Sequence, residues 1–278
     1  MKIGACIVLK NMAKLENQFK TLKDNGFTVC QFISWNPTHW TDENAEIING
    51  YVKKYGITIT AFWCGWTGPC YWNFYEGQIS LGLVPTAYRS ERMKELCAGA
   101  DFAKKLGVTD VITHMGYIPE NPYDPNFAPF CLAVKMVARH LENNGQYLLF
   151  ETGQETPTTM LRCFEQIGMD NLGINLDTGN LVLYGKGNPV DALDVFGKYV
   201  RNIHAKDGFF PTDGHNLGKE ARVGDGRVDF RLFFERLKEI GYDTYVIIER
   251  EISGEQQLKD VIHAKEYLSK LVSEIYGG

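Results

Sequence analysis

The sequence predicts an α/β protein folded as a single (β/α)₈ barrel, the TIM-barrel architecture, with residues 1–278 forming one domain. Eight short β-branched or aromatic segments alternate along the chain with eight amphipathic segments. Six of the amphipathic segments are followed by glycine, which readily adopts the left-handed conformation that ends a helix. The order helix, glycine, strand is typical of a parallel sheet, and eight strand–helix units match one barrel.

The expected elements follow each other in strict order. The predicted strands are Lys2–Val8, Thr28–Ile33, Ile57–Trp63, Val108–Thr113, Gln146–Glu151, Leu172–Asp177, Val200–Ala205 and Tyr245–Glu249. The predicted helices are Leu15–Asn25, Glu43–Tyr55, Ser90–Leu106, Phe130–Asn143, Thr158–Ile167, Val190–Tyr199, Phe230–Ile240 and Gln256–Val272. A doubly wound sheet is the alternative, but it calls for a Gly-x-Gly-x-x-Gly fingerprint after the first strand, where Leu9–Met12 stands instead.

Composition excludes several classes of protein. Hydrophobic residues make up 44% of the chain and charged residues 23%, which excludes a disordered or fibrous protein. The net charge of -5 argues against a nucleic-acid partner, because such binders need surplus cations. No apolar segment approaches the ~18 residues of a membrane span, and the start of the chain reads as a strand rather than a signal peptide. Seven cysteines without a Cys-x-x-Cys motif indicate buried free thiols in a reducing cytoplasm.

Four predicted strands end in groups that bind metals. In a barrel of this kind the chemistry lies at the carboxyl-terminal ends of the strands, and strands five to eight end at Glu151, Asp177, His204 and Glu249. Any one of these alone could be a solvated or hydrogen-bonded strand-end residue. Four together favour a joint site for one divalent metal ion, because isolated charges after apolar segments would be costly. The oxygen-rich donor set suits Mn²⁺ first, with Co²⁺, Mg²⁺ or Zn²⁺ as alternatives.

Further polar and aromatic residues are candidates for substrate contact. Lys206 shares a strand face with His204 and could hold a hydroxyl, carboxylate or phosphate oxygen, or simply be solvated. His114 could contact a substrate oxygen or be a core histidine. All five tryptophans lie between residues 35 and 72, and we expect contact with a sugar from Trp35, Trp63 or Trp66. The segment 67–85 has no regular pattern and is expected to be a lid, with a packed cluster under the loop as the alternative.

Several motifs around these residues resemble the xylose isomerase-like sugar phosphate isomerase/epimerase superfamily. They are Phe150–Gly153, Asn175–Asn180, Ile203–Gly208, Val223–Phe230 and Gly241–Asp243 followed by Ile247–Glu249. The resemblance implies one divalent ion held by Glu151, Asp177, His204 and Glu249. It also implies that Glu151 and Glu249 are the proton-transfer pair. In the ketose 3-epimerases of that superfamily a sugar-binding histidine follows the metal aspartate by three residues, and this chain has Asn180 there.

The sequence therefore predicts a metal-dependent sugar isomerase or epimerase that removes a proton next to a carbonyl through a metal-bound enediolate. The same site could serve a lyase or dehydratase on a keto-sugar or 3-keto-glycoside. An endonuclease IV-type repair enzyme needs three zinc ions and therefore many histidines at the strand ends. This chain has only six histidines in total. A non-catalytic sugar-binding barrel would be expected to lose a ligand. The expected partner is a small carbohydrate, and association into a homo-oligomer remains open.

Overall fold

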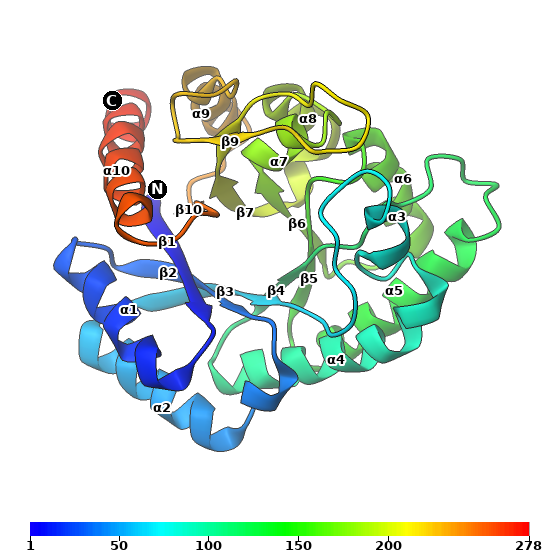
Figure 1. Ribbon diagram of the computed structural model, residues 1–278, viewed down its shortest axis with the longest axis horizontal. Coiled ribbons are helices and arrows are strands. Elements are labelled where there is room, and N and C mark those ends of the chain that lie inside the picture. The colour runs from blue at the N-terminus through cyan, green and yellow to red at the C-terminus, as the bar shows by residue number, and fades with distance from the viewer. Residues whose placement is uncertain (278) are drawn as a thin grey trace.

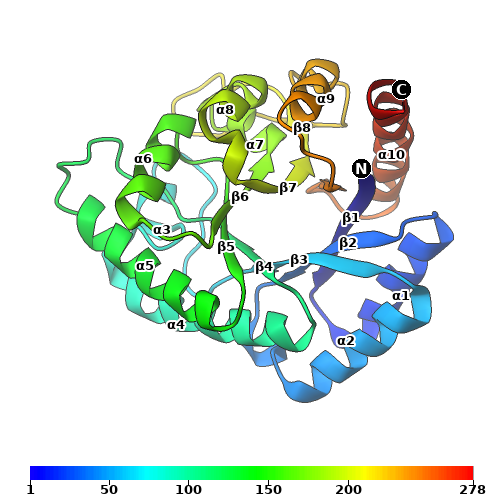
Figure 2. The same ribbon diagram turned by 180° about the vertical axis from the view of Figure 1, so that it is seen from behind.

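The computed structural model describes residues 1–277 as a closed barrel of eight parallel strands inside a layer of helices (Figure 1 and, from behind, Figure 2). The strands follow the order β1-β10-β7-β6-β5-β4-β3-β2, so every strand lies beside its neighbour in the chain. The predicted fold is confirmed. The barrel strands are β1 (Lys2–Leu9), β2 (Val29–Ser34), β3 (Thr58–Cys64), β4 (Asp110–Thr113), β5 (Tyr147–Glu151), β6 (Leu172–Asp177), β7 (Val200–Ala205) and β10 (Tyr245–Ile248).

The eight predicted helices form the outer layer. They are α1 (Met12–Asp24), α2 (Asp42–Tyr55), α4 (Thr86–Lys105), α5 (Phe127–Asn143), α6 (Pro157–Ile167), α8 (Pro189–Phe196), α9 (Phe230–Glu239) and α10 (Glu255–Tyr276). Shorter elements that the sequence did not predict lie in the connections. They are η1 (Pro37–His39), α3 (Gly77–Ser80), α7 (Thr178–Leu183), η2 (Gly197–Tyr199), β8 (Asp207–Gly208) and β9 (Glu220–Ala221). Within the described part of the chain, none of these helices has the length and apolarity to traverse a bilayer.

Alternation along the strands separates the barrel interior from the layer under the helices. Phe62 packs in the large cluster between sheet and helices, whereas the next residue, Trp63, belongs to a second cluster. The same alternation sends Val111 outward and Ile112 inward, as expected from the two-residue repeat of a strand. The second cluster also takes in Leu149, so apolar side chains fill the barrel interior beneath its open end.

One carboxylate holds the connection that follows β7. Asp207 is buried, and its oxygens accept hydrogen bonds from the backbone N–H groups of Gly208, Gly224, Gly226 and Val228 at 2.8–3.1 Å. A side chain at Gly226 would overlap Asp207 Oδ1, so glycine is required there. The motif Val223–Phe230 is thus folded around a residue that lies three positions after His204.

The connection after β3 is ordered rather than structureless, which corrects the expectation for residues 67–85. It contains α3, and the buried guanidinium of Arg92 donates to the backbone oxygens of Pro69, Ser80 and Gly82. Its tip reaches the connection after β7, where Asn73 forms an isolated bridge with Asn216. The neighbouring backbone N–H of Phe74 donates to His215 O at 2.9 Å. The connections after β3 and β7 therefore meet.

We predict that Asp207→Ala lowers the free energy of unfolding by about 2–4 kcal/mol, because four backbone N–H groups lose their acceptor and two of these hydrogen bonds, to Gly208 and Val228, are buried. Urea unfolding followed by circular dichroism measures the change. The matched control is Asp213→Ala, which removes a carboxylate that also accepts from two backbone N–H groups but lies at an exposed turn. Its effect should stay below about 1 kcal/mol. Equal losses in both variants would contradict a special role for Asp207.

Candidate metal centre and active site

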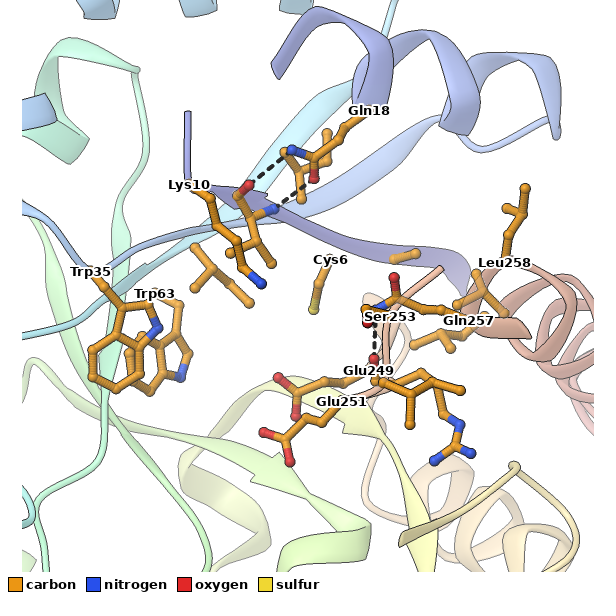
Figure 3. A pocket seen from close by; sticks show the side chains of 18 of the residues that line it. Cys6, Lys10, Gln18, Trp35, Trp63, Glu249, Glu251, Ser253, Gln257 and Leu258 are labelled. Carbon is orange, nitrogen blue, oxygen red and sulfur yellow. Dashed lines mark hydrogen bonds between the residues drawn. The ribbon is translucent and has the colours of Figure 1, made fainter. Parts of the chain in front are cut away.

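A cavity of about 1150 Å³ lies at the carboxyl-terminal ends of the barrel strands (Figure 3). Six of the residues predicted to form the site line it: Trp35, Trp63, His114, Glu151, Asn180 and Glu249. Asp177 and His204 are fully buried, and Lys206 is almost so. The predicted residues therefore come together at one end of the barrel, although they are spread over more than 200 positions of the chain.

Glu151, Asp177, His204 and Glu249 form one compact group in which a ligand atom of each lies within 4.8 Å of all the others. The ring atom His204 Nδ1 is surrounded by carboxylate oxygens. It lies 3.0 Å from Glu151 Oε1, 3.4 Å from Glu249 Oε2 and 3.5 Å from Asp177 Oδ2. Three carboxylates and one imidazole nitrogen thus converge on a volume of the size that a single ion needs.

Asp177 is held so that one of its oxygens remains free. It is the N-cap of α7, and its Oδ1 accepts from the backbone N–H of Asn180 at 2.7 Å. The Thr152 hydroxyl fixes the Asp177 backbone on both sides, donating to its oxygen and accepting from its N–H, each at 2.9 Å. Asp177 Oδ2 is buried without a hydrogen-bond partner. A buried carboxylate oxygen left unpaired is costly unless a cation meets it, so these residues fit a divalent metal ion.

Gln31 on β2 orients the imidazole of His204. The two side chains meet with Gln31 Oε1 2.6 Å from His204 Nε2. Because an amide oxygen can only accept, Nε2 carries the hydrogen, and Nδ1 is directed at the carboxylates. Gln31 was not among the site residues predicted from the sequence. The available signal was a glutamine inside Val29–Ser34, a strand that is buried at every position.

The buried charges shift one another's pKa values. Burial opposes protonation of His204, but Glu249 and Glu151 outweigh this effect and raise its pKa well above the usual value. Burial raises the pKa of Asp177 to about 7, although Lys206 opposes the shift. Burial also favours the neutral acid at Glu249, but Lys206 and His204 prevail and hold its pKa well below the usual value. Shifts of this kind cluster at functional sites.

Lys206 forms ion pairs with the carboxylates and does not line the cavity. Its Nζ lies 3.2 Å from Glu249 Oε2, 2.9 Å from Glu251 Oε2 and 4.0 Å from Asp177 Oδ2. Burial favours the neutral amine, yet Glu249 and Glu251 outweigh it and raise the pKa of Lys206 well above the usual value. The lysine is therefore a fixed positive charge beside Glu249. Glu251, which lines the cavity, was not among the predicted site residues.

An aromatic wall borders the cavity. The rings of Trp35 and Trp63 lie 4.7 Å apart between centroids, and the Trp63 Nε1–H donates to Glu151 Oε2. The ring of His114 continues this wall, 5.8 Å from Trp63 and 5.2 Å from Trp72. Burial lowers the pKa of His114, and its Nδ1 has no partner. Trp72 lines the cavity although the sequence did not single it out.

Trp66 occupies a different position from the other two tryptophans expected to contact substrate. It is not among the residues that line the cavity. It is buried, meets the edge of Trp35 at 5.2 Å between centroids, and lies under the Arg92 guanidinium at 5.2 Å. This position behind Trp35 gives it packing contacts in the cluster under the loop.

The family to which the chain belongs follows from comparison with known proteins. The model of the xylose isomerase-like TIM barrel family matches residues 19–271. The chain belongs to this family. A solved structure of a xylose isomerase domain protein from Planctomyces limnophilus is 31% identical, with a TM-score of 0.93 and coverage of 100% of this chain and 99% of that chain. The resemblance seen in the strand-end motifs is thereby confirmed.

The chain is similar in sequence to dehydratases, and it shares its fold with an epimerase. The inosose dehydratase of Lacticaseibacillus casei is 29% identical over 42% of this chain and 44% of its own length, so the match spans less than half of that enzyme. The fold is shared with an L-ribulose 3-epimerase, at 18% identity and a TM-score of 0.74 over 99% of this chain and 96% of that chain.

Outside the metal-binding group, Glu155 is a further buried carboxyl in the connection between β5 and α6. Both of its oxygens lack hydrogen-bond partners, and burial raises its pKa to about 8. The folded protein therefore favours the neutral acid. Below the ordinary pKa of about 4.5 the carboxyl is neutral in both the folded and the unfolded chain, and the stability of the folded state is complete. As the pH rises from there through about 8, the unfolded chain ionises more readily than the folded one, and this stability is lost.

We predict that the wild-type protein loses stability relative to Glu155→Gln between pH 5 and pH 8, by on the order of 2–3 kcal/mol. The glutamine variant is the isosteric control, because it cannot ionise. Urea unfolding of both proteins, stripped of metal with a chelator, gives the difference at each pH. A constant difference across this range would mean that Glu155 ionises normally in the folded state.

Proposed function

We propose that this xylose isomerase-like barrel is a divalent-metal-dependent sugar isomerase or epimerase that transfers a proton at the carbon next to a carbonyl. The observation that carries the proposal is the convergence of three carboxylates on His204 Nδ1 beneath a cavity of carbohydrate size. Asp177 Oδ2 accepts no hydrogen bond and so adds an oxygen that is available to a cation. Mn²⁺ is the ion we expect first from the oxygen-rich set, with Co²⁺, Mg²⁺ and Zn²⁺ as alternatives.

The metal site and the proton-transfer groups are the same residues in this proposal. Glu151, Asp177, His204 and Glu249 would hold the ion, which when bound polarises a carbonyl and acidifies the neighbouring C–H. Glu249 is kept ionised by Lys206, so it can accept that proton. Glu151 lines the same cavity and is oriented by the Trp63 N–H, so it can return a proton from its own side. Return to the same carbon inverts it, and return to the adjacent carbon isomerises the sugar.

The cavity wall supports a carbohydrate as substrate. Trp35 and Trp63 present indole faces that can stack on the C–H face of a sugar. His114 and Asn180 also line the cavity and offer polar atoms to hydroxyl groups of the substrate. Lys206 is assigned to Glu249 and Glu251 rather than to direct substrate contact. The net charge of -5 remains an argument against a nucleic-acid partner.

A lyase or dehydratase is the second candidate, and the sequence similarity to inosose dehydratase favours it specifically. The first step is unchanged in this alternative. After the proton next to the carbonyl has gone to the carboxylate, a hydroxyl or glycosyl group on the β-carbon leaves with its bonding electrons. The product then contains a carbon–carbon double bond instead of a new stereocentre.

The test of the proposed reaction is solvent exchange. We expect metal-loaded protein in deuterated water to place deuterium on the carbon next to the carbonyl, because a carboxylate proton exchanges with solvent. Nuclear magnetic resonance of the products from free ketoses, inosose, hydroxypyruvate and 3-keto-glycosides measures both the label and the product class. Turnover with no label at that carbon would indicate a hydride shift and refute proton transfer.

Glu151→Gln and Glu249→Gln should each lower kcat by roughly 10²–10⁴-fold if the two residues transfer protons. Both also belong to the metal-binding group, so the metal content of each variant is measured in the same samples. The comparison is made at equal occupancy by the ion. Full turnover of either variant at equal occupancy would remove that residue from the proton-transfer pair.

Trp35→Ala should raise KM for the substrate by about 10-fold or more while leaving metal affinity unchanged, because the lost stacking area faces the cavity. Trp40→Phe is the control: this tryptophan lies in the same stretch of sequence, donates to Ser34 Oγ and packs on Phe62, away from the cavity. Steady-state kinetics of both variants measure the difference. An unchanged KM in Trp35→Ala would assign the ring to packing alone.

A further inference from the structure

A cysteine lies beside the carboxylate and imidazole groups of the proposed metal site. The Cys6 Sγ, one nitrogen of His204 and one oxygen of Glu249 lie within 4.8 Å of one another. This second potential ligand set shares His204 and Glu249 with the four-residue set. The two sets therefore share two residues, and Cys6 lies at the edge of the four-residue set, within reach of His204 and Glu249.

The position of Cys6 follows from the strand pairing. β1 pairs with β10, with Ala5 opposite Ile248, so the next position on each strand brings Cys6 beside Glu249. Side chains alternate along β1. Cys6 and Val8 pack against the cluster inside the barrel and line the cavity, and Ala5 and Ile7 belong to the cluster between the sheet and the helices. In Figure 3 the sulfur of Cys6 is directed toward the carboxylate of Glu249. The thiol is thus aimed at the ligands by the sheet itself.

We propose that Cys6 is an additional, thiolate ligand of the metal ion, which raises the affinity of the site for Zn²⁺ and Co²⁺ more than for Mg²⁺ and Mn²⁺. This inference rests on the metal site of the proposed function and extends it. Carboxylate oxygens suit Mg²⁺ and Mn²⁺, whereas a soft sulfur ligand favours the borderline metals Zn²⁺ and Co²⁺. On binding, the S–H bond breaks, the sulfur donates its electron pair to the ion, and the proton passes to solvent.

The chain offers a matched control in Cys30. This thiol is buried on the neighbouring strand β2 and packs in the cluster toward the helices. It does not line the cavity, and it belongs to neither potential ligand set. Cys30→Ser therefore makes the same chemical change one strand away, without altering the proposed ligands.

The experiment loads chelator-stripped protein with Co²⁺ and records its absorption spectrum. The visible ligand-field bands report bound cobalt with any ligands, whereas a near-ultraviolet charge-transfer band reports a cobalt–thiolate bond. We expect both signals in the wild type and in Cys30→Ser. Cys6→Ser and Cys6→Ala should keep the visible bands and lose the charge-transfer band. Competition titrations should show Zn²⁺ affinity falling by about 10-fold or more in both Cys6 variants, and Mg²⁺ affinity by far less.

The outcomes separate this inference from the metal site on which it rests. Visible bands without a charge-transfer band in the wild type would overturn the role of Cys6 and leave the four-residue site intact. A charge-transfer band that survives in Cys6→Ser and Cys6→Ala would assign the bond to another thiol and also overturn it. Absence of any cobalt binding by the wild type would overturn the metal site of the proposed function itself. Circular dichroism verifies that each variant is folded.

Discussion

Burying three carboxylates within a few ångströms of each other is the constraint around which this barrel is organised. Glu151 and Asp177 are buried and the Glu249 side chain is 12% exposed at the cavity, so the three would repel one another strongly in a medium of low polarity. Two positive groups stand against them, the imidazole of His204 and the ammonium of Lys206. In the protein without a metal ion these two positive groups offset the three carboxylates. The same three carboxylates would attract and hold a divalent cation.

The surrounding structure fixes these charges through neutral partners on adjacent strands. Thr152, just after β5, fixes the backbone of Asp177 on β6, and Thr178 donates to the backbone oxygen of Lys206, just after β7, at 2.7 Å. Gln31, across the barrel on β2, fixes the far nitrogen of His204. Neutral partners can orient charged ligands without adding to the charge imbalance. The rigidity of the site is therefore a property of the whole ring of strands.

The barrel and the four strand-end ligands could be predicted from the sequence because each has a local signature. Apolar segments ending in a charged residue, as at Phe150-Glu151, show where a strand stops and what stands there. Gln31 and Cys6 could not be found in this way. Each lies within an otherwise apolar strand. The role of Gln31 depends on His204, 173 positions away, and the role of Cys6 depends on the pairing of β1 with β10, which closes the barrel.

The aromatic residues show a different limit. The clustering of five tryptophans indicated an aromatic wall, but not which rings would face the cavity. Trp66 packs behind Trp35 under a buried arginine, while Trp72 from the same connection lines the cavity. The direction of each ring is set by α3 and the Arg92 contacts that shape the connection, and these arise from tertiary packing rather than from any local pattern.

The bonds between the connections after β3 and β7 have a mechanical consequence. Asn73 and Phe74 are tied to residues 215–216, so a displacement of one connection would pull on the other. That pull travels along residues 209–219 toward the strand that carries His204. It ends at Asp207, where four backbone bonds anchor the chain and β8 pairs with β9. Asp207 thus anchors the chain between the loop that meets the connection after β3 and the strand that carries His204.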